Sequence, residues 1–67
     1  MINSEKIKQK MKAENISQKE LAAILGIEPS SLNCKINNKR SVDVREACII
    51  QDALRIPDDD FRSYFFT

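Results

Sequence analysis

The amino-acid sequence predicts an all-α protein, a single compact domain over residues 1–67 built from five helices. Apolar residues recur three and four positions apart, and no stretch shows the alternation of a half-buried strand. Two capping pairs, Ser17 with Glu20 and Asp43 with Glu46, mark helix starts because each pair satisfies two backbone donors. A domain of this length buries only about 60% of the surface of its unfolded chain, so the core is small.

The first helix is expected over about residues 4–14. Ile7 and Met11 are four positions apart and therefore face the same side, which we expect to be the inward side. Asn15 tolerates the left-handed backbone that ends a helix. Ile16 then packs back before the next helix begins.

The second and third helices are short and are joined by a glycine turn. The second covers about residues 18–25, and Gly26 supplies the left-handed conformation that ends it. The third covers about residues 29–37, and Pro29 suits its first turn because the missing amide proton has no partner there. The inward positions expected on these two helices are Leu21, Ala22, Leu25, Leu32 and Ile36.

The fourth helix begins after the Asp43 cap and ends before Pro57, and the acidic run 58–60 begins the fifth, where negative charge suits the helix dipole. The inward positions expected on the fourth helix are Val44, Ala47, Cys48, Ile50, Gln51 and Leu54. Those expected on the fifth are Phe61, Tyr64 and Phe65.

The composition argues against several classes of function. The chain has no His, and Cys34 and Cys48 lack the spacing of metal ligands, so we expect two reduced thiols that pack as small apolar side chains and no metal. Asp58, Asp59 and Asp60 are the remaining candidates for catalysis, and acidic residues at a helix start are usually caps. We therefore expect no enzyme activity, no cofactor and no small-molecule ligand.

No apolar run approaches the roughly 18 residues of a membrane span, and the first residues lack the apolar stretch of a secretion signal. We therefore expect a cytoplasmic protein that does not interact with membranes. The net charge of +1 conceals an uneven distribution. Residues 1–40 carry eight Lys or Arg against four Glu, and residues 41–67 carry three Arg against six Asp or Glu. A basic side of this kind is suited to phosphates, although an ordinary solvated surface explains it equally well.

The segment 17–37 has the layout of a DNA-reading helix-turn-helix. Two short helices cross over a tight turn, and small polar residues, Ser30 and Asn33 among them, lie on the outer face of the second. Asn33 can pair with the N6/N7 edge of adenine, and Ser30 can donate or accept at several bases. No Arg on this helix is set to contact guanine, so we expect DNA shape and phosphate contacts to supply much of the selectivity.

The chain resembles the Cro/CI-type (Xre-like, lambda-repressor-like) family of DNA-binding regulators over about residues 4–66. The residues that carry the resemblance include Ser17-Gln18, Glu20-Leu21-Ala22, Leu25-Gly26-Ile27, Leu32 and Lys39-Arg40. Two positions depart from the family pattern: Lys35 stands where an aliphatic residue is usual, and Asn38 replaces the usual loop glycine. The resemblance implies a compact five-helix fold and a small sequence-specific transcriptional regulator of the phage or prophage Cro/repressor kind.

The resemblance also implies roles for individual residues when the third helix enters the major groove of double-stranded operator DNA. The positions expected to face base edges are Glu28, Pro29, Ser30, Asn33 and Cys34. The positions expected to contact phosphates, through side chains or the amides of a helix N-terminus, are Ser17, Gln18, Lys19, Lys35, Asn37, Lys39 and Arg40. Gln18 is also expected to brace the start of the third helix.

Many members of this family bind as two-fold dimers, and two apolar residues are left over from the expected core. Ile49 and Phe66 are the candidates for a dimer patch, because exposed apolar clusters often mark contact sites. A homodimer of this kind would set two reading helices about 34 Å apart, one turn of DNA. The alternative is a protein-docking module of the same fold, antirepressor- or antitoxin-like, that does not bind DNA.

Overall fold

The computed structural model describes residues 1–66, and within this range the chain forms five α-helices and one short 3-10 turn. The elements are α1 (Ser4–Ala13), α2 (Gln18–Leu25), α3 (Pro29–Ile36), α4 (Val44–Leu54), η1 (Asp58–Asp60) and α5 (Phe61–Phe65). The predicted all-α fold is confirmed for these residues, and Thr67, the last residue of the predicted domain, lies outside them. None of these helices is long and apolar enough to cross a membrane.

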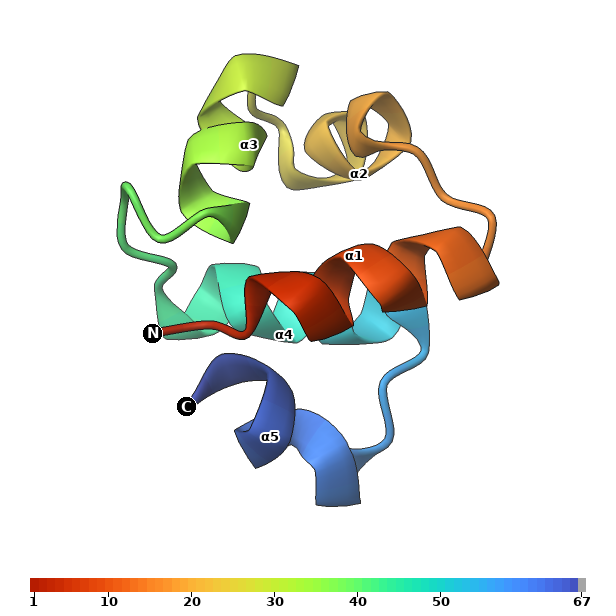
Figure 1. Cartoon of the computed structure of the whole chain (residues 1–67). Helices are drawn as coiled ribbons and strands as arrows, with labels where there is room; N and C mark the ends of the chain where they lie inside the picture. Colours follow the sequence, from red (N-terminus) through yellow and green to blue (C-terminus); the bar gives the residue numbers. More distant parts are fainter. Residues whose placement is uncertain (67) are drawn as a thin grey trace.

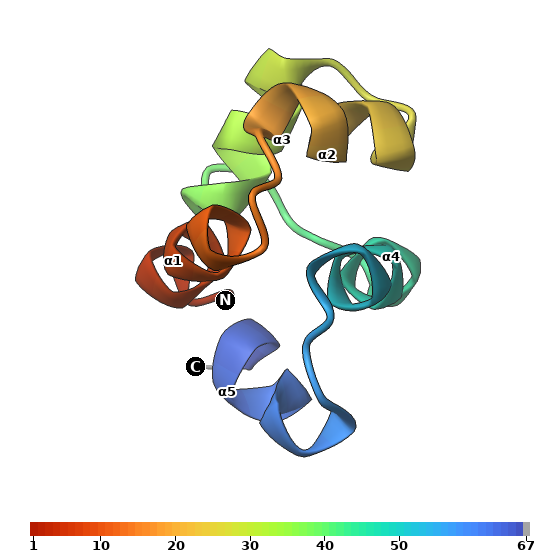
Figure 2. The same cartoon turned by 90° about the vertical axis from the view of Figure 1, so that its right-hand side faces the viewer.

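The helices surround a single core. The pair α2 and α3 forms one end of the molecule and α5 the opposite end, with α1 and α4 on two sides between them (Figure 1, Figure 2). Each helix contributes buried side chains, and burial of each large one stabilises the fold by about 1.5–3 kcal/mol. The largest that are fully enclosed are Ile7, Leu21, Leu32, Ile36, Ile50 and Leu54.

The helix starts follow the capping signals of the sequence. Ser17 and Asp43 each accept a hydrogen bond from the backbone N–H three residues later, at 3.1 and 2.7 Å. Glu20 and Glu46 accept the reciprocal bonds from the N–H groups of Ser17 and Asp43. Both capping boxes are therefore confirmed. The α1 helix has a simpler cap, in which the Asn3 side chain accepts from the Lys6 amide.

The helices α1 to α4 all end in the same turn. In each, one residue with a left-handed backbone follows the helix, and the next N–H returns to a carbonyl five positions back, at 2.8–3.0 Å. The left-handed residues are Asn15, Gly26, Asn38 and Arg55, with φ between 56° and 73°. The residues that follow them are Ile16, Ile27, Lys39 and Ile56.

Two of the inward positions expected on α4 are wrong. The Val44 side chain is 72% exposed, and Cys48 is also exposed, so Cys48 does not pack as a small apolar residue. The buried face of α4 is centred on Ala47, Ile50 and Leu54. Helical spacing places Val44 at the edge of this face and Cys48 outside it, at 100° per residue. Val44 lines a hollow with Phe61 and Phe66 and stays exposed. Both cysteines are free thiols, and Cys34 is partly buried.

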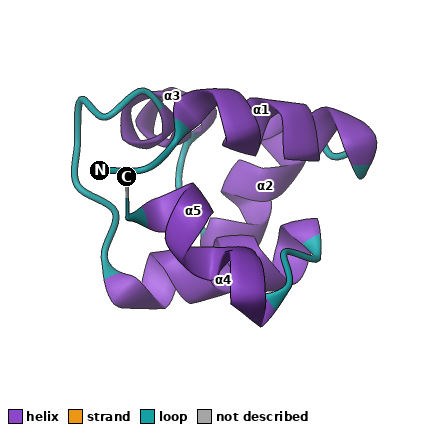
Figure 3. Cartoon of the chain, turned by 60° about the horizontal axis from the view of Figure 1, so that its bottom comes forward, coloured by secondary structure: helices purple, strands orange, loops and turns teal. Residues whose placement is uncertain are grey.

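The first residues of the chain pack against α5, so the two ends of the described chain lie close together (Figure 3). The Asn3 N–H donates to the Tyr64 carbonyl at 2.7 Å. The Lys6 ammonium donates to the Ser63 hydroxyl at 3.0 Å and lies 4.7 Å from the centre of the Tyr64 ring. On the inner side of α5, Phe65 is buried, and Phe61 and Tyr64 pack against the core as expected.

Candidate nucleic-acid interface

The α3 helix lies at the periphery of the molecule (Figure 1). It has one buried and one exposed side. Leu32 and Ile36 are fully buried, and Ser30 and Asn33 are exposed. This division follows from helical spacing: four positions bring Leu32 and Ile36 onto one side, and Ser30 and Asn33 fall outside it. The outer side therefore has the small polar character that a major-groove helix needs.

The remaining positions expected to face bases lie on or beside this outer surface. Glu28 and Pro29 are exposed at the start of α3, and Cys34 is partly buried. Glu28 is the N-cap residue but its side chain makes no capping bond, and Pro29 occupies the first helical turn as predicted. Glu28 is the only acidic residue within the segment 28–40.

The start of α2 presents free backbone donors beside α3. The Ser17 N–H is already bonded to Glu20, so the expected phosphate contact through this amide is unsupported. Gln18 and Lys19 are the first two residues of α2, where backbone N–H groups have no partner within a helix. In residues 1–66 the Gln18 side chain forms no hydrogen bond, so the expected brace to α3 is not formed.

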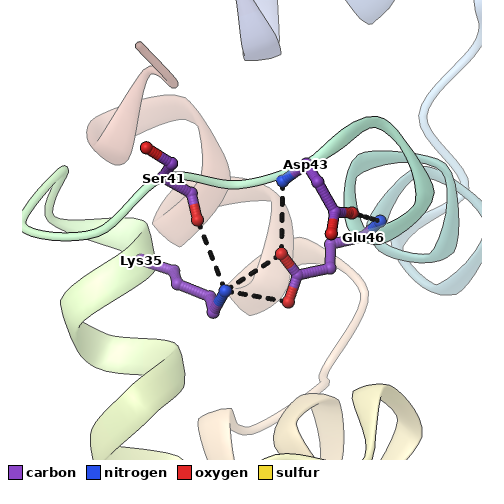
Figure 4. A network of polar contacts seen from close by, with 4 residues as sticks. All are labelled: Lys35, Ser41, Asp43 and Glu46. Carbon is purple, nitrogen blue, oxygen red and sulfur yellow. Dashed lines mark hydrogen bonds and ion pairs between the residues drawn. The ribbon is translucent and has the colours of Figure 1, made fainter.

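Lys35 holds α3 to α4 and does not project toward solvent (Figure 4). Its ammonium lies 2.9 Å from both carboxylate oxygens of Glu46 and 3.3 Å from the Ser41 carbonyl oxygen. Glu46 in turn accepts from the Asp43 amide within the capping box of α4. The Lys35 and Glu46 side chains retain only 17% and 16% of their exposure. This arrangement argues against the phosphate role expected for Lys35 and explains how a lysine occupies a usually aliphatic position.

The loop after α3 is anchored at one residue and exposed at the next two. The Asn38 side chain accepts from the Ile2 N–H at 2.9 Å and donates to the Ile2 carbonyl at 3.0 Å. The Ser4 hydroxyl donates to the Ile36 carbonyl, the carbonyl of the last α3 residue. Lys39 and Arg40 are exposed immediately after this anchor. The backbone that carries these two cations is therefore held to the end of α3.

Lys8 is a candidate that the sequence reasoning did not select. Its ammonium donates to Asn37 Oδ1 at 3.0 Å, and the Asn37 Nδ2 donates to Asn33. Lys8 is exposed on α1, beside the end of α3. Four lysines alternate along α1, so their spacing alone did not indicate which of them lies next to α3.

The expected dimer patch does not form as one surface. Phe66 is 64% exposed and lines a hollow together with Val44, Val42 and Phe61. Ile49 is only partly exposed and lies five positions after Val44, which is about 140° around the helix. Ile49 and Phe66 therefore lie on different sides of α4, and Val44 is the apolar neighbour of Phe66.

The fold and this surface define a helix-turn-helix protein, and the comparison with protein families agrees. The profile of the helix-turn-helix family, in its Xre/Cro/CI-like form, matches residues 7–61, which is most of the chain. The chain belongs to this family, whose members are DNA-binding regulators. The comparisons with curated proteins and with solved structures found no significant match.

Proposed function

We propose that this chain is a sequence-specific transcriptional regulator that binds double-stranded operator DNA, with α3 in the major groove. The observation that carries the proposal is the exposed polar face of α3, with Ser30 and Asn33, next to the exposed pair Lys39 and Arg40. Polar side chains on a groove-sized helix read base edges, and flanking cations hold phosphates.

The proposed contacts divide into two groups. Ser30 and Asn33 contact base edges, with Pro29 and Cys34 filling space or touching a thymine methyl and Glu28 at the entry of α3. The DNA phosphates are bound by Lys39, Arg40 and Lys19, together with the free backbone N–H groups at the start of α2. Asn37 lies at the boundary between the groups, since its side chain already bonds to Lys8 and Asn33.

Selection of bound duplexes from random DNA, followed by titration at two salt concentrations, tests this proposal. We expect a preferred sequence and an affinity that falls steeply with salt, because phosphate contacts release counterions. Asn33→Ala should reduce the preference for the selected sequence by about 1–3 kcal/mol and leave the salt dependence unchanged. No binding at low salt would refute the proposal and favour the docking module of the same fold.

We further propose that the chain acts as a homodimer through the apolar surface formed by Val44 and Phe66. Both side chains are more than half exposed and line the same hollow. Val44 begins α4 and Phe66 follows α5, so this surface includes no residue of α3, and two copies can pair without covering their reading helices. Phe66 also lines a second hollow together with Lys39 and Arg40.

Analytical ultracentrifugation tests the dimer. Phe66→Asp should shift the protein toward monomer, because it places a charge in an apolar contact. Ile49→Asp is the matched control: it changes the partly exposed residue on the other side of α4 and should leave association unchanged. A larger shift toward monomer in Ile49→Asp than in Phe66→Asp would place the interface on the Ile49 side of α4 instead.

A further inference from the structure

Three side chains from two separated segments form a directed chain of hydrogen bonds on the surface of α3. The Lys8 ammonium donates to Asn37 Oδ1 at 3.0 Å. Asn37 Nδ2 then donates both to the backbone carbonyl and to the Oδ1 of Asn33, each at 3.0 Å. Lys8 is 29 positions from Asn37 in the sequence, so a residue of α1 acts on the exposed face of α3.

The chemistry of these groups sets the direction of each amide. An ammonium only donates, so the Asn37 atom next to Lys8 is its oxygen and the opposite end is its NH₂ group. That NH₂ group donates, so the Asn33 atom that faces it is the side-chain oxygen. The Asn33 NH₂ group therefore points away from Asn37. Within the described residues it has no partner.

We propose that Lys8 is a positioning residue that reinforces the direction in which the Asn33 amide meets a base pair, and hence strengthens the preference for A·T over the inverted T·A pair there. The inference rests on the proposed function. Asparagine pairs with adenine by accepting from N6 and donating to N7, and this match depends on the order of its two ends. The Asn33 oxygen keeps one lone pair for N6, and its NH₂ group is available for N7.

The bond from Lys8 is exposed in the free protein, but it gains strength when DNA covers it. A protein–DNA interface excludes bulk water from the reading helix, and hydrogen bonds in a lower dielectric are stronger and reinforce one another along a chain. Without Lys8 the Asn37 Oδ1 loses its donor, and the orientation of the Asn37 amide then depends only on the bonds from its NH₂ group to Asn33. The bond from Asn37 to the Asn33 side chain is weaker as a result, and the Asn33 amide is held less firmly in its direction.

The alternative role for Lys8 is a simple phosphate contact, and the two roles differ in what they change. A phosphate contact strengthens binding to all sequences alike and contributes to the salt dependence. A positioning role changes the ratio of affinities for two duplexes that differ by inversion of one base pair. Lys12 provides the control: it is exposed one helical turn further along α1, and its side chain has no partner in the described residues.

The experiment uses the full chain and its selected duplex. The base pair read by Asn33 is first located as the position whose preference is lost in Asn33→Ala. The affinities for the duplex and for its inversion at that pair are then measured for the unmodified protein and for Lys8→Met, Lys8→Arg and Lys12→Met. We expect a preference of about tenfold in the unmodified protein. We expect it to fall to about threefold or less in Lys8→Met and to return in Lys8→Arg, since arginine also only donates.

Lys12→Met should keep the full preference although it removes the same charge. Equal weakening of both duplexes by Lys8→Met, with the ratio unchanged, would overturn the inference and leave Lys8 as a phosphate contact. Nuclear magnetic resonance of the free protein gives a second readout: the Asn37 side-chain NH₂ signals should shift in Lys8→Met and not in Lys12→Met, and unchanged signals also overturn the inference. Failure of the unmodified protein to bind any duplex removes the proposed function, and this inference with it.

Discussion

The ends of α2 and α3 share one backbone geometry and differ in their surroundings. Gly26 and Asn38 have φ of 73° and 62°, and the next N–H closes the turn at 3.0 and 2.8 Å. After α2, Ile27 packs against the core, whereas after α3 the corresponding residue is the exposed Lys39. The same hydrogen-bonded turn therefore covers the core at one helix end and projects a cation at the other.

The left-handed residues of these two turns also differ. A side chain added at Gly26 would meet no atom within 4 Å, so this position needs only the conformation of glycine. Asn38 adopts the same conformation and in addition binds both backbone groups of Ile2. The turn after α3 is thus joined to the beginning of the chain, and the turn after α2 is held only by its own backbone and Ile27. Substitutions in each of the two turns test this difference.

The largest effect is expected from Lys39→Ala combined with Arg40→Ala. Loss of two phosphate contacts should weaken binding to all duplexes about 30-fold near 0.15 M salt and reduce the salt slope by roughly two. Thermal stability should change little, because both side chains are exposed. Fluorescence anisotropy at several salt concentrations measures the slope.

Lys35→Met is the matched control for that double variant. It removes a neighbouring cation whose ammonium is bound to Glu46, and it introduces an unbranched apolar side chain. We expect stability to fall by about 1 kcal/mol, because Glu46 loses its partner, and the salt slope to remain unchanged. A slope reduced by one in this variant would restore Lys35 to the phosphate contacts.

The next effect is expected from Asn38→Ala. Alanine is strained in the left-handed region and leaves the Ile2 N–H without its partner, which together should cost about 2 kcal/mol of folding stability. Asn38→Gly keeps the conformation and loses only the side-chain bonds to Ile2 and Ser4, so it should cost about 1 kcal/mol. Urea unfolding measures both. Equal values for the two variants would mean that the backbone conformation contributes nothing.

These two turns also show which features the sequence could predict. The cap of Ser17, the turn at Gly26 and the inward positions of α2 and α3 depend on residues within about five positions of one another, and each was predicted correctly. The pairing of Lys35 with Glu46 joins residues 11 positions apart, and the bond from Lys8 to Asn37 spans 29. Helical spacing carries no information on such partners, because they depend on how the helices pack.

The errors on α4 have the same origin. Val44 lies at the edge of its apolar face, and whether an edge residue is buried depends on the neighbour that covers it. Cys48 lies outside this face, whose centre is known only once the helix is packed. The prediction that Phe66 lies outside the core is confirmed. The prediction that Phe66 shares a patch with Ile49 is not, because the sequence does not give the direction of α5 relative to α4. The exposed face of α3 can therefore be predicted from residues close together in the sequence, whereas the neighbours of Phe66 and of Asn33 depend on how the helices pack.

A smaller effect is expected from Gly26→Ala. The added methyl group has open space, so the cost is that of the left-handed backbone alone, about 1 kcal/mol. Urea unfolding should show this loss of folding stability. The DNA affinity of the folded protein should stay the same, because the turn at Gly26 only packs Ile27 against the core. A loss of affinity without a loss of stability would contradict the division between the two turns.

The smallest effect is expected at the end of α4, where Arg55 holds the left-handed position with φ of 56°. Its side chain is 84% exposed and lies 3.9 Å from Glu14, an ion pair that solvent screens almost completely. Arg55→Gly relieves the backbone strain but increases the conformational freedom of the unfolded chain. We therefore expect a net gain in folding stability of about 0.5 kcal/mol. Arg55→Ala removes the same charge and keeps the strain, and it should leave stability unchanged. If alanine and glycine stabilise equally, the gain comes from charge and the left-handed turn is not strained.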